Sequence, residues 1–173
     1  MVDNYAVDMF NVPLLHLNID DWENKKPLLL DMMSKNMDYF SQRVSKDLNS
    51  NNIKIESILK TELDQFNSYF NFTHCKIHLS WFNKAVTGDY HTVHNHSVIG
   101  YSSVCYIEYD HDEHTPLEFI SPFNNFLTGE TIYYIPQVTE GSIIFFPSAI
   151  LHYTLPNKSK KDRSILAFNL DVK

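Results

Sequence analysis

The sequence predicts a mainly β fold, with two N-terminal helices followed by an antiparallel sandwich or barrel of jelly-roll type. Three observations carry this prediction. Helical spacing of apolar residues is confined to the first 75 positions, short β-branched or aromatic runs separated by Gly, Pro, Asn or Asp follow, and no helical pattern interrupts them. A length of 173 residues fits one domain. We therefore expect a single domain over 1–173, with a strand and supporting helices in 1–75 and the β-barrel core in 76–173.

The N-terminal part predicts one edge strand and two amphipathic helices. Residues 9–19 are expected to be extended, at a sheet edge because Pro13 cannot donate to a strand ladder. Asp20-Asp21 signals a helix start, and apolar residues then recur every three or four positions as far as Phe40. A second helix follows the Asn-rich break at 49–52. Its apolar stripe consists of Ile55, Ile58, Leu59, Leu63, Phe66, Tyr69 and Phe70. Both helices are expected to pack on one outer face of the sheet.

The β part contains six predicted strands. They are residues 76–83, 98–109, 117–120, 131–135, 142–146 and 163–172. In the last strand, alternation puts Arg163, Ile165, Ala167 and Asn169 on one face and Ser164, Leu166, Phe168 and Leu170 on the other. The first face is typical of a pocket wall, because a buried arginine requires an anion. The second, mostly apolar face is expected to lie under the helices.

Charge and composition exclude several classes of function. The chain has 14 basic and 21 acidic residues without a run of Lys or Arg, which disfavours a nucleic-acid partner or an acidic membrane surface. No apolar stretch approaches the roughly 20 residues of a bilayer span, and the N-terminus does not read as a signal peptide. We expect a cytoplasmic protein without a membrane partner. Cys75 and Cys105 lie in strand-like runs and are expected to be reduced core thiols.

Histidines gather at one place in the β part. His91, His94 and His96 fall within six residues, and on a regular strand His94 and His96 share a face while His91 points to the other. Positions two apart on a strand are separated by about 6.6 Å, so two imidazoles can meet at one metal about 2.1 Å from each nitrogen. The pair predicts a two-point metal site, with surface histidines as the alternative. His152 follows an apolar strand and a proline turn, where a barrel rim is expected.

These motifs occur in a characteristic order. The His-x-His pair, the segment 141–152 ending in His152, Arg163 eleven residues later and the closing Phe168-Asn169 together resemble the Fe(II)/2-oxoglutarate-dependent oxygenases. More narrowly, the chain is similar to small oxygenases of bacteria and tailed phages. Trp81-Phe82-Asn83 matches the strand before their metal motif, and residues 102–106 match their Ser-Gly-aromatic-Tyr run. The resemblance extends from residue 9 onward.

The resemblance implies a fold, an activity and cofactors. The fold is a double-stranded β-helix with the metal site at the mouth of the barrel. The cofactor is Fe(II), and the cosubstrate is 2-oxoglutarate. The activity is dioxygenase chemistry that consumes O2, hydroxylates a small-molecule or peptide substrate and decarboxylates 2-oxoglutarate to succinate. The segment 121–137 would form the substrate entrance. Neither the substrate nor the oligomeric state is implied.

The resemblance also implies roles for particular residues. His94 and His152 would be metal ligands, and Arg163 would hold the distal carboxylate of 2-oxoglutarate as a bidentate fork. Tyr106 and Asn169 would be further cosubstrate contacts. Trp81 and Asn83 share one strand face and are candidates to line the substrate side, with a core position as the alternative for Trp81. His91 is a candidate substrate contact or proton relay, with a solvated loop histidine as the alternative.

His96 departs from the superfamily pattern, in which the middle ligand is Asp or Glu. Three interpretations stay open. His96 is the third ligand of a three-histidine site, or a carboxylate completes the ligand set, or His96 faces away. The carboxylates nearest in sequence are Asp89, Glu108 and Asp110.

Two other functions fit the same residues. One is a cupin-like, three-histidine dioxygenase that does not use 2-oxoglutarate, in which Arg163 binds the anion of the substrate. The other is a non-catalytic jelly-roll binding module, in which replacing Arg163 affects stability alone. The joint presence of His152 and Arg163 favours the oxoglutarate-dependent enzyme.

Overall fold

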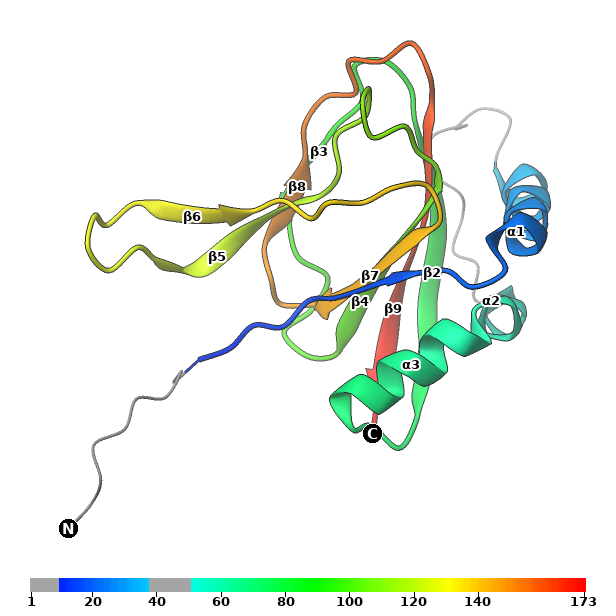
Figure 1. Ribbon diagram of the computed structural model, residues 1–173, viewed down its shortest axis with the longest axis horizontal. Helices are drawn as coiled ribbons and strands as arrows, with labels where there is room; N and C mark the ends of the chain where they lie inside the picture. Colours follow the sequence, from blue (N-terminus) through cyan, green and yellow to red (C-terminus); the bar gives the residue numbers. More distant parts are fainter. Residues whose placement is uncertain (1–9, 38–50) are drawn as a thin grey trace.

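A computed structural model describes residues 10–37 and 51–173, and two antiparallel sheets face each other in it (Figure 1). The five-stranded sheet has the order β1-β7-β4-β9-β2, and the four-stranded sheet has the order β3-β8-β5-β6. The strands of the larger sheet are β1 (Leu15–Asn18), β2 (Cys75–Ala85), β4 (Tyr101–Glu108), β7 (Ser142–Pro147) and β9 (Arg163–Val172). Those of the smaller sheet are β3 (His91–His94), β5 (Glu118–Asn124), β6 (Thr131–Tyr134) and β8 (His152–Thr154).

From β2 onward the chain passes back and forth between the sheets. β2, β4, β7 and β9 lie in the larger sheet, whereas β3, β5, β6 and β8 lie in the smaller one. This alternation of antiparallel strands produces a double-stranded β-helix, so the predicted fold class is confirmed. Each of the six predicted strands is present, and β1 pairs with β7 alone, as expected of an edge strand. The three-residue β8 is too short to give a sequence pattern and was not predicted.

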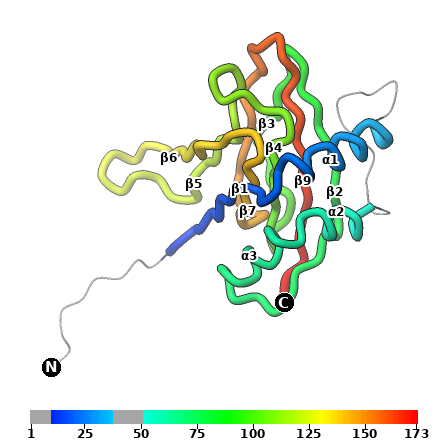
Figure 2. Tube along the Cα trace, turned by 45° about the vertical axis from the view of Figure 1, so that its right-hand side comes forward, coloured from blue at the N-terminus to red at the C-terminus, as the bar shows by residue number. Residues whose placement is uncertain are grey.

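Three helices cover the outer face of the larger sheet (Figure 2): α1 (Trp22–Asn36), α2 (Asn52–Ile58) and α3 (Lys60–Phe70). Their buried side chains pack with Leu166, Phe168 and Leu170, the face of β9 predicted to lie under the helices. The second predicted helix is divided at Leu59, where φ and ψ are -99° and 22°. Tyr69 was wrongly placed in the buried stripe: it is 57% exposed, with its ring against Phe70. Phe40 lies outside the described residues.

A second apolar cluster fills the space between the sheets. Ile165 and Ala167 of β9 face this space, together with Tyr106, Phe119 and Phe146. The predicted alternation of β9 is therefore confirmed. Cys75 and Cys105 are buried and form no disulfide, as expected of core thiols. None of the helices in the described ranges has both the length and the apolar character needed to cross a bilayer.

Gly100 fixes the loop between β3 and β4 against β9. Its φ is +81°, and a Cβ at this position would lie 2.8 Å from the backbone oxygen of Leu170. The left-handed conformation alone costs an L-residue about 1–2 kcal/mol. We expect Gly100→Ala to lower the free energy of unfolding, measured by urea denaturation, by about 2 kcal/mol or more because the steric clash adds to this cost.

Gly129 provides a matched control for that substitution. It also has a positive φ, +73°, but no atom lies within 4 Å of the position that a Cβ would take. Gly129→Ala should therefore show only the conformational cost. Equal destabilisation by the two substitutions would contradict a role for the close approach at Gly100.

Candidate metal centre

Three histidines converge between the two sheets. His94 ends β3 and His152 begins β8, and the two residues are direct partners in the ladder. His96 lies in the bend after β3. One ring nitrogen from each of the three lies within 4.8 Å of the others, and the Nε2 atoms of His96 and His152 are 3.2 Å apart. Two nitrogens about 2.1 Å from one ion at a right angle are about 3.0 Å apart. The spacing therefore fits ligands of a single metal ion.

Backbone carbonyls orient two of the three imidazoles. Nδ1 of His94 donates to the oxygen of Thr92 at 2.7 Å, and Nδ1 of His152 donates to the oxygen of Ile150 at 2.9 Å. In the neutral tautomer with hydrogen on Nδ1, Nε2 carries the lone pair, and a hydrogen bond at the second nitrogen is the usual support for a ligating histidine.

Burial keeps two of these imidazoles neutral. Burial is the main cause that lowers the pKa of His96 and of His152 from 6.5 to about 4. The nearby His94 ring lowers both values further, whereas the carbonyl of Ile150 partly opposes the shift at His152. Neutral imidazole is the form that binds metal.

The strand geometry expected for the three neighbouring histidines is only partly correct. β3 ends at His94, so His96 reaches the cluster from the following bend, not by alternation along a strand. His91 was expected on the opposite face, which is wrong because its ring centroid lies 6.1 Å from that of His94. The register shifts between these two residues: His91 pairs with Thr154 and His94 with His152. This irregularity is a bulge, which turns both rings to one side.

None of the three carboxylates considered from the sequence joins the histidine group among the described residues. Asp89 accepts the backbone N–H of Val86 at 3.1 Å. Glu108 accepts the hydroxyl of Ser164 at 2.5 Å, and Asp110 pairs with Lys161 at 2.7 Å. The geometry therefore favours His96 over a carboxylate as the third member of the cluster.

Arg163 places a buried cation at the start of β9. The residue is 3% exposed, and its guanidinium donates to the oxygen of Thr115 at 2.5 Å and to Oγ1 of Thr154 at 3.4 Å. Its Nε has no hydrogen-bond partner, and no carboxylate of the described residues forms an ion pair with it. Burial lowers the pKa of the guanidinium, whereas Tyr106, Tyr109 and the carboxylate of Asp89, which lines the same cavity, oppose this shift. An unpaired buried cation of this kind fits an anionic ligand.

The arginine and the histidines belong to one region. Arg163 and His91 line a cavity of about 400 Å³ together with Asn83, and His91 also borders the opening beside His94. Thr154 lies two residues after His152, hence on the same face and about 6.6 Å further along β8. Its Oγ1 accepts both from Arg163 and from the backbone N–H of His91, at 3.0 Å. Sequence reasoning missed Thr154, although alternation from His152 would have indicated it.

Of the other predicted site residues, Trp81 and Asn83 contact histidine rings of this region. Trp81 stacks at a tilt on His96, with ring centroids 5.2 Å apart, and the amide of Asn83 contacts Nε2 of His91 at 3.4 Å. Tyr106 is buried, and its hydroxyl accepts the backbone N–H of Leu117 at 3.3 Å. The amide oxygen of Asn169 accepts from the hydroxyl of Ser102 at 2.9 Å.

The segment 121–137 forms most of the β5–β6 hairpin, which projects from the sandwich (Figure 1). Phe126 and Leu127 at its tip are more than nine-tenths exposed. Phe123 stacks on Phe10 with centroids 5.3 Å apart, and both rings line an apolar groove of about 320 Å³. Phe119 lines the same groove and contacts the ring of His152 at 5.8 Å. One wall of the groove therefore adjoins the metal centre.

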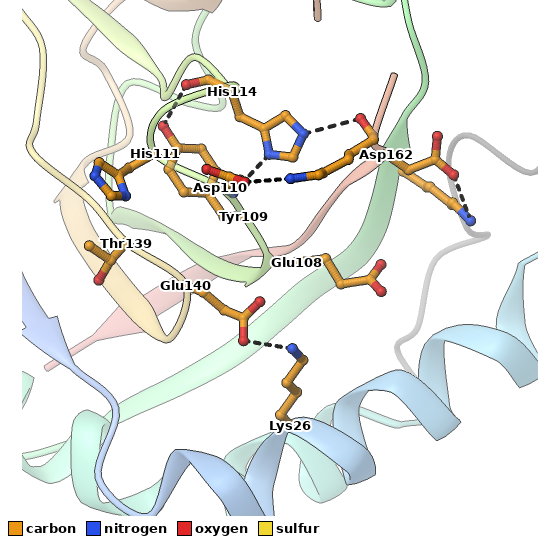
Figure 3. Close-up of a pocket in the computed structure, with 11 residues that line it drawn as sticks. Lys26, Glu108, Tyr109, Asp110, His111, His114, Thr139, Glu140 and Asp162 are labelled. Carbon is orange, nitrogen blue, oxygen red and sulfur yellow. Dashed lines mark hydrogen bonds and ion pairs between the residues drawn. The ribbon is translucent and has the colours of Figure 1, made fainter. Parts of the chain in front are cut away.

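A larger cavity, of about 670 Å³, lies elsewhere, between α1 and the turn after β4 (Figure 3). Its lysines are paired with acids: Lys26 with Glu140, Lys84 with Asp162, and Lys161 with Asp110 and Glu113. His114, which lines it, has both ring nitrogens bonded to backbone groups. None of the three clustered histidines lines this cavity, so its size does not mark the candidate metal centre.

Comparison with known proteins agrees with this fold. Residues 79–169 match the family described as "Putative 2OG-Fe(II) oxygenase". No curated protein matches the sequence. Among solved structures, a viral collagen prolyl hydroxylase from Paramecium Bursaria Chlorella virus-1 has a TM-score of 0.64 at 12% identity, covering 98% of this chain and 97% of that one. SnoN, an α-ketoglutarate-dependent epimerase from nogalamycin biosynthesis, has a TM-score of 0.71 at 8% identity, covering 91% and 77%.

A further structural relative is longer than this chain. It is an oxidoreductase of the 2OG-Fe(II) oxygenase family from Burkholderia pseudomallei, with a TM-score of 0.52 and 15% identity. The alignment covers 67% of this chain and 57% of that protein. At such low identities these likenesses define the fold alone.

A double-stranded β-helix with three clustered histidines and a buried arginine is typical of a jelly-roll metalloprotein. The matched region includes the histidines and the arginine and covers more than half of the sequence. The chain belongs to the 2OG-Fe(II) oxygenase family, an oxidoreductase family whose members use Fe(II) and 2-oxoglutarate.

Proposed function

We propose that the protein hydroxylates a C–H bond of a small molecule or of a peptide side chain. In this reaction, the substrate, 2-oxoglutarate and O2 are converted to the hydroxylated substrate, succinate and CO2. The observation that carries the proposal is the presence, in one region, of three clustered histidines and a buried arginine that forms no ion pair with a carboxylate of the described residues. Bound Fe(II) with 2-oxoglutarate supplies the activation of O2.

His94, His96 and His152 are proposed to hold the metal. Their nitrogens are already close together, and two rings are oriented by backbone carbonyls, so little reorganisation is needed when the ion binds. Because imidazole ligands carry no negative charge, the three histidines would not compensate the positive charge of the metal ion. The dianionic cosubstrate can supply that compensation.

Arg163 is proposed to bind the distal carboxylate of 2-oxoglutarate. Its guanidinium donates to Oγ1 of Thr154, which lies two residues after His152 on β8. Tyr106 is proposed to border the cosubstrate near the guanidinium. Trp81, Asn83 and His91 are proposed to line the substrate side, since they contact the metal-centre rings or the cavity beside Arg163.

The residues of the site also limit the access of water. Phe119 and Phe146 pack their rings against His152, with centroids 5.8 and 5.0 Å away. Such apolar walls exclude water from a reactive centre and strengthen the attraction between Arg163 and an anion.

An anaerobic titration tests this proposal. Fe(II) and then 2-oxoglutarate are added to the metal-free protein, and we expect a visible metal-to-ligand charge-transfer band that is lost in His94→Ala and in Arg163→Ala. His78→Ala is the matched control, because His78 is a half-exposed histidine on β2 beside Asp171, and should keep the band. Iron binding without a band would favour the three-histidine dioxygenase that does not use 2-oxoglutarate. Absence of iron binding would favour the binding module.

A further inference from the structure

His96 is held differently from the other two histidines. His94 and His152 pair with each other in the β3–β8 ladder, and each Nδ1 donates to a nearby carbonyl. His96 follows the end of β3, and its backbone N–H donates to the oxygen of Ser148 at 3.1 Å. The position of His96 therefore depends on the turn that carries Ser148.

Ser148 is held in turn by a buried chain of polar side chains. Its hydroxyl lies 2.8 Å from that of Ser102, which lies 2.9 Å from the amide oxygen of Asn169. Ser102 has one hydroxyl hydrogen and donates it to Asn169, so it must accept from Ser148. The three residues are at most 5% exposed. Hydrogen bonds so well shielded from water are costly to break.

The chain of hydrogen bonds joins three parts of the fold. Asn169 lies on β9, Ser102 on β4, and Ser148 in the turn that follows β7. The N–H of Ser148 also donates to the oxygen of Gly100 at 3.0 Å, which ties the turn to the loop that contains His96. The rigid larger sheet thereby sets the position of a loop residue.

We propose that Ser102, Ser148 and Asn169 form a positioning relay for His96. The relay holds the turn so that the backbone oxygen of Ser148 fixes His96 against Trp81 and beside His152. The proposal rests on the proposed function, because His96 matters to the reaction only as a metal ligand. It also gives Asn169 a role on the metal side of the pocket.

Ser102→Ala is the most direct test. It removes both hydroxyl contacts of the relay but leaves the backbone of the turn and all three histidines unchanged. Loss of a group that supports a ligand typically weakens metal binding 10- to 100-fold. We expect a loss of this size in affinity for Ni(II), an air-stable stand-in for Fe(II), measured by isothermal titration calorimetry.

A double-mutant cycle separates positioning of His96 from a general effect on structure. In the His96→Ala background, Ser102→Ala should cause no further loss of Ni(II) affinity. In the metal-free protein, Ser102→Ala should also speed hydrogen exchange of the His96 amide. Asn169→Ala, which removes only the final acceptor, should behave in the same way and replaces Ser102→Ala if that variant does not fold.

Ser103→Ala provides the matched control. Ser103 is the next residue on β4, is equally buried, and its hydroxyl has no partner. This variant should bind Ni(II) as tightly as the unmodified protein. The relay is excluded if Ser102→Ala binds Ni(II) as tightly as Ser103→Ala, or loses the same factor with and without His96. If the unmodified protein binds no Ni(II), the proposed function fails and the relay with it.

Discussion

Replacing His152 by alanine is expected to weaken Fe(II) binding by well over 100-fold and to abolish 2-oxoglutarate turnover. His152 is the central member of the cluster: its Nε2 lies 3.2 Å from that of His96, and it pairs with His94 across the ladder. Loss of a supporting residue alone typically costs 10- to 100-fold, and loss of a ligand costs more. Calorimetric titration under anaerobic conditions measures the affinity, and succinate formation measures the turnover.

The structure also predicts what His152→Ala should not change. The residue lies in a three-residue strand, and the larger apolar cluster lies on the far side of the larger sheet. The metal-free variant should therefore still unfold cooperatively. A variant that keeps turnover would contradict the assignment of the metal centre, whereas His78→Ala should resemble the unmodified protein in both measurements.

Replacing Arg163 by methionine is expected to weaken binding of 2-oxoglutarate by at least about 30-fold, while Fe(II) binding is kept. Removing one partner of a buried, hydrogen-bonded charge pair costs about 2–5 kcal/mol, and about 1.4 kcal/mol corresponds to a factor of ten. Arg163→Lys keeps the charge but cannot form a bidentate fork, so its loss should be intermediate. Titration of each Fe(II)-loaded variant with 2-oxoglutarate measures its affinity for 2-oxoglutarate.

The stability of the metal-free Arg163→Met variant distinguishes ligand binding from a structural role. Burial lowers the pKa of this guanidinium, and its Nε has no partner, so the cation is costly in the absence of a ligand. We expect a melting temperature equal to or higher than that of the unmodified protein. Clear destabilisation without any change in 2-oxoglutarate affinity would favour the non-catalytic module.

Most of the architecture could be predicted because it follows from local patterns. The spacing of apolar residues separated helices from strands, and alternation along β9 correctly put Arg163 and Ile165 on one face and Leu166 on the other. Errors occurred where tertiary contacts override the pattern. The helix break at Leu59 and the exposure of Tyr69 depend on how the helices lie on the sheet.

The candidate site was predicted in its members but not in its geometry. The His-x-His spacing, together with an order of motifs that resembles a known family, singled out His94, His96, His152 and Arg163. The orientation of the imidazole rings could not be predicted from the sequence. A bulge turned His91 toward the cluster, and the bend after β3 brought His96 to it.

The sequence by itself thus determined the fold class, the order of helices and strands along the chain and the chemical groups available to the site. Only the tertiary structure decided that His96, and none of the carboxylates in the described ranges, completes the cluster, that Arg163 forms no ion pair with an acid in those ranges, and that Ser102 and Ser148 support the loop. The physical reason is that the apolar periodicity of helices and strands depends on residues that are close together in the sequence. Ligand convergence and charge pairing depend on residues such as His96 and His152, which lie far apart in sequence and meet only when the sheets pack.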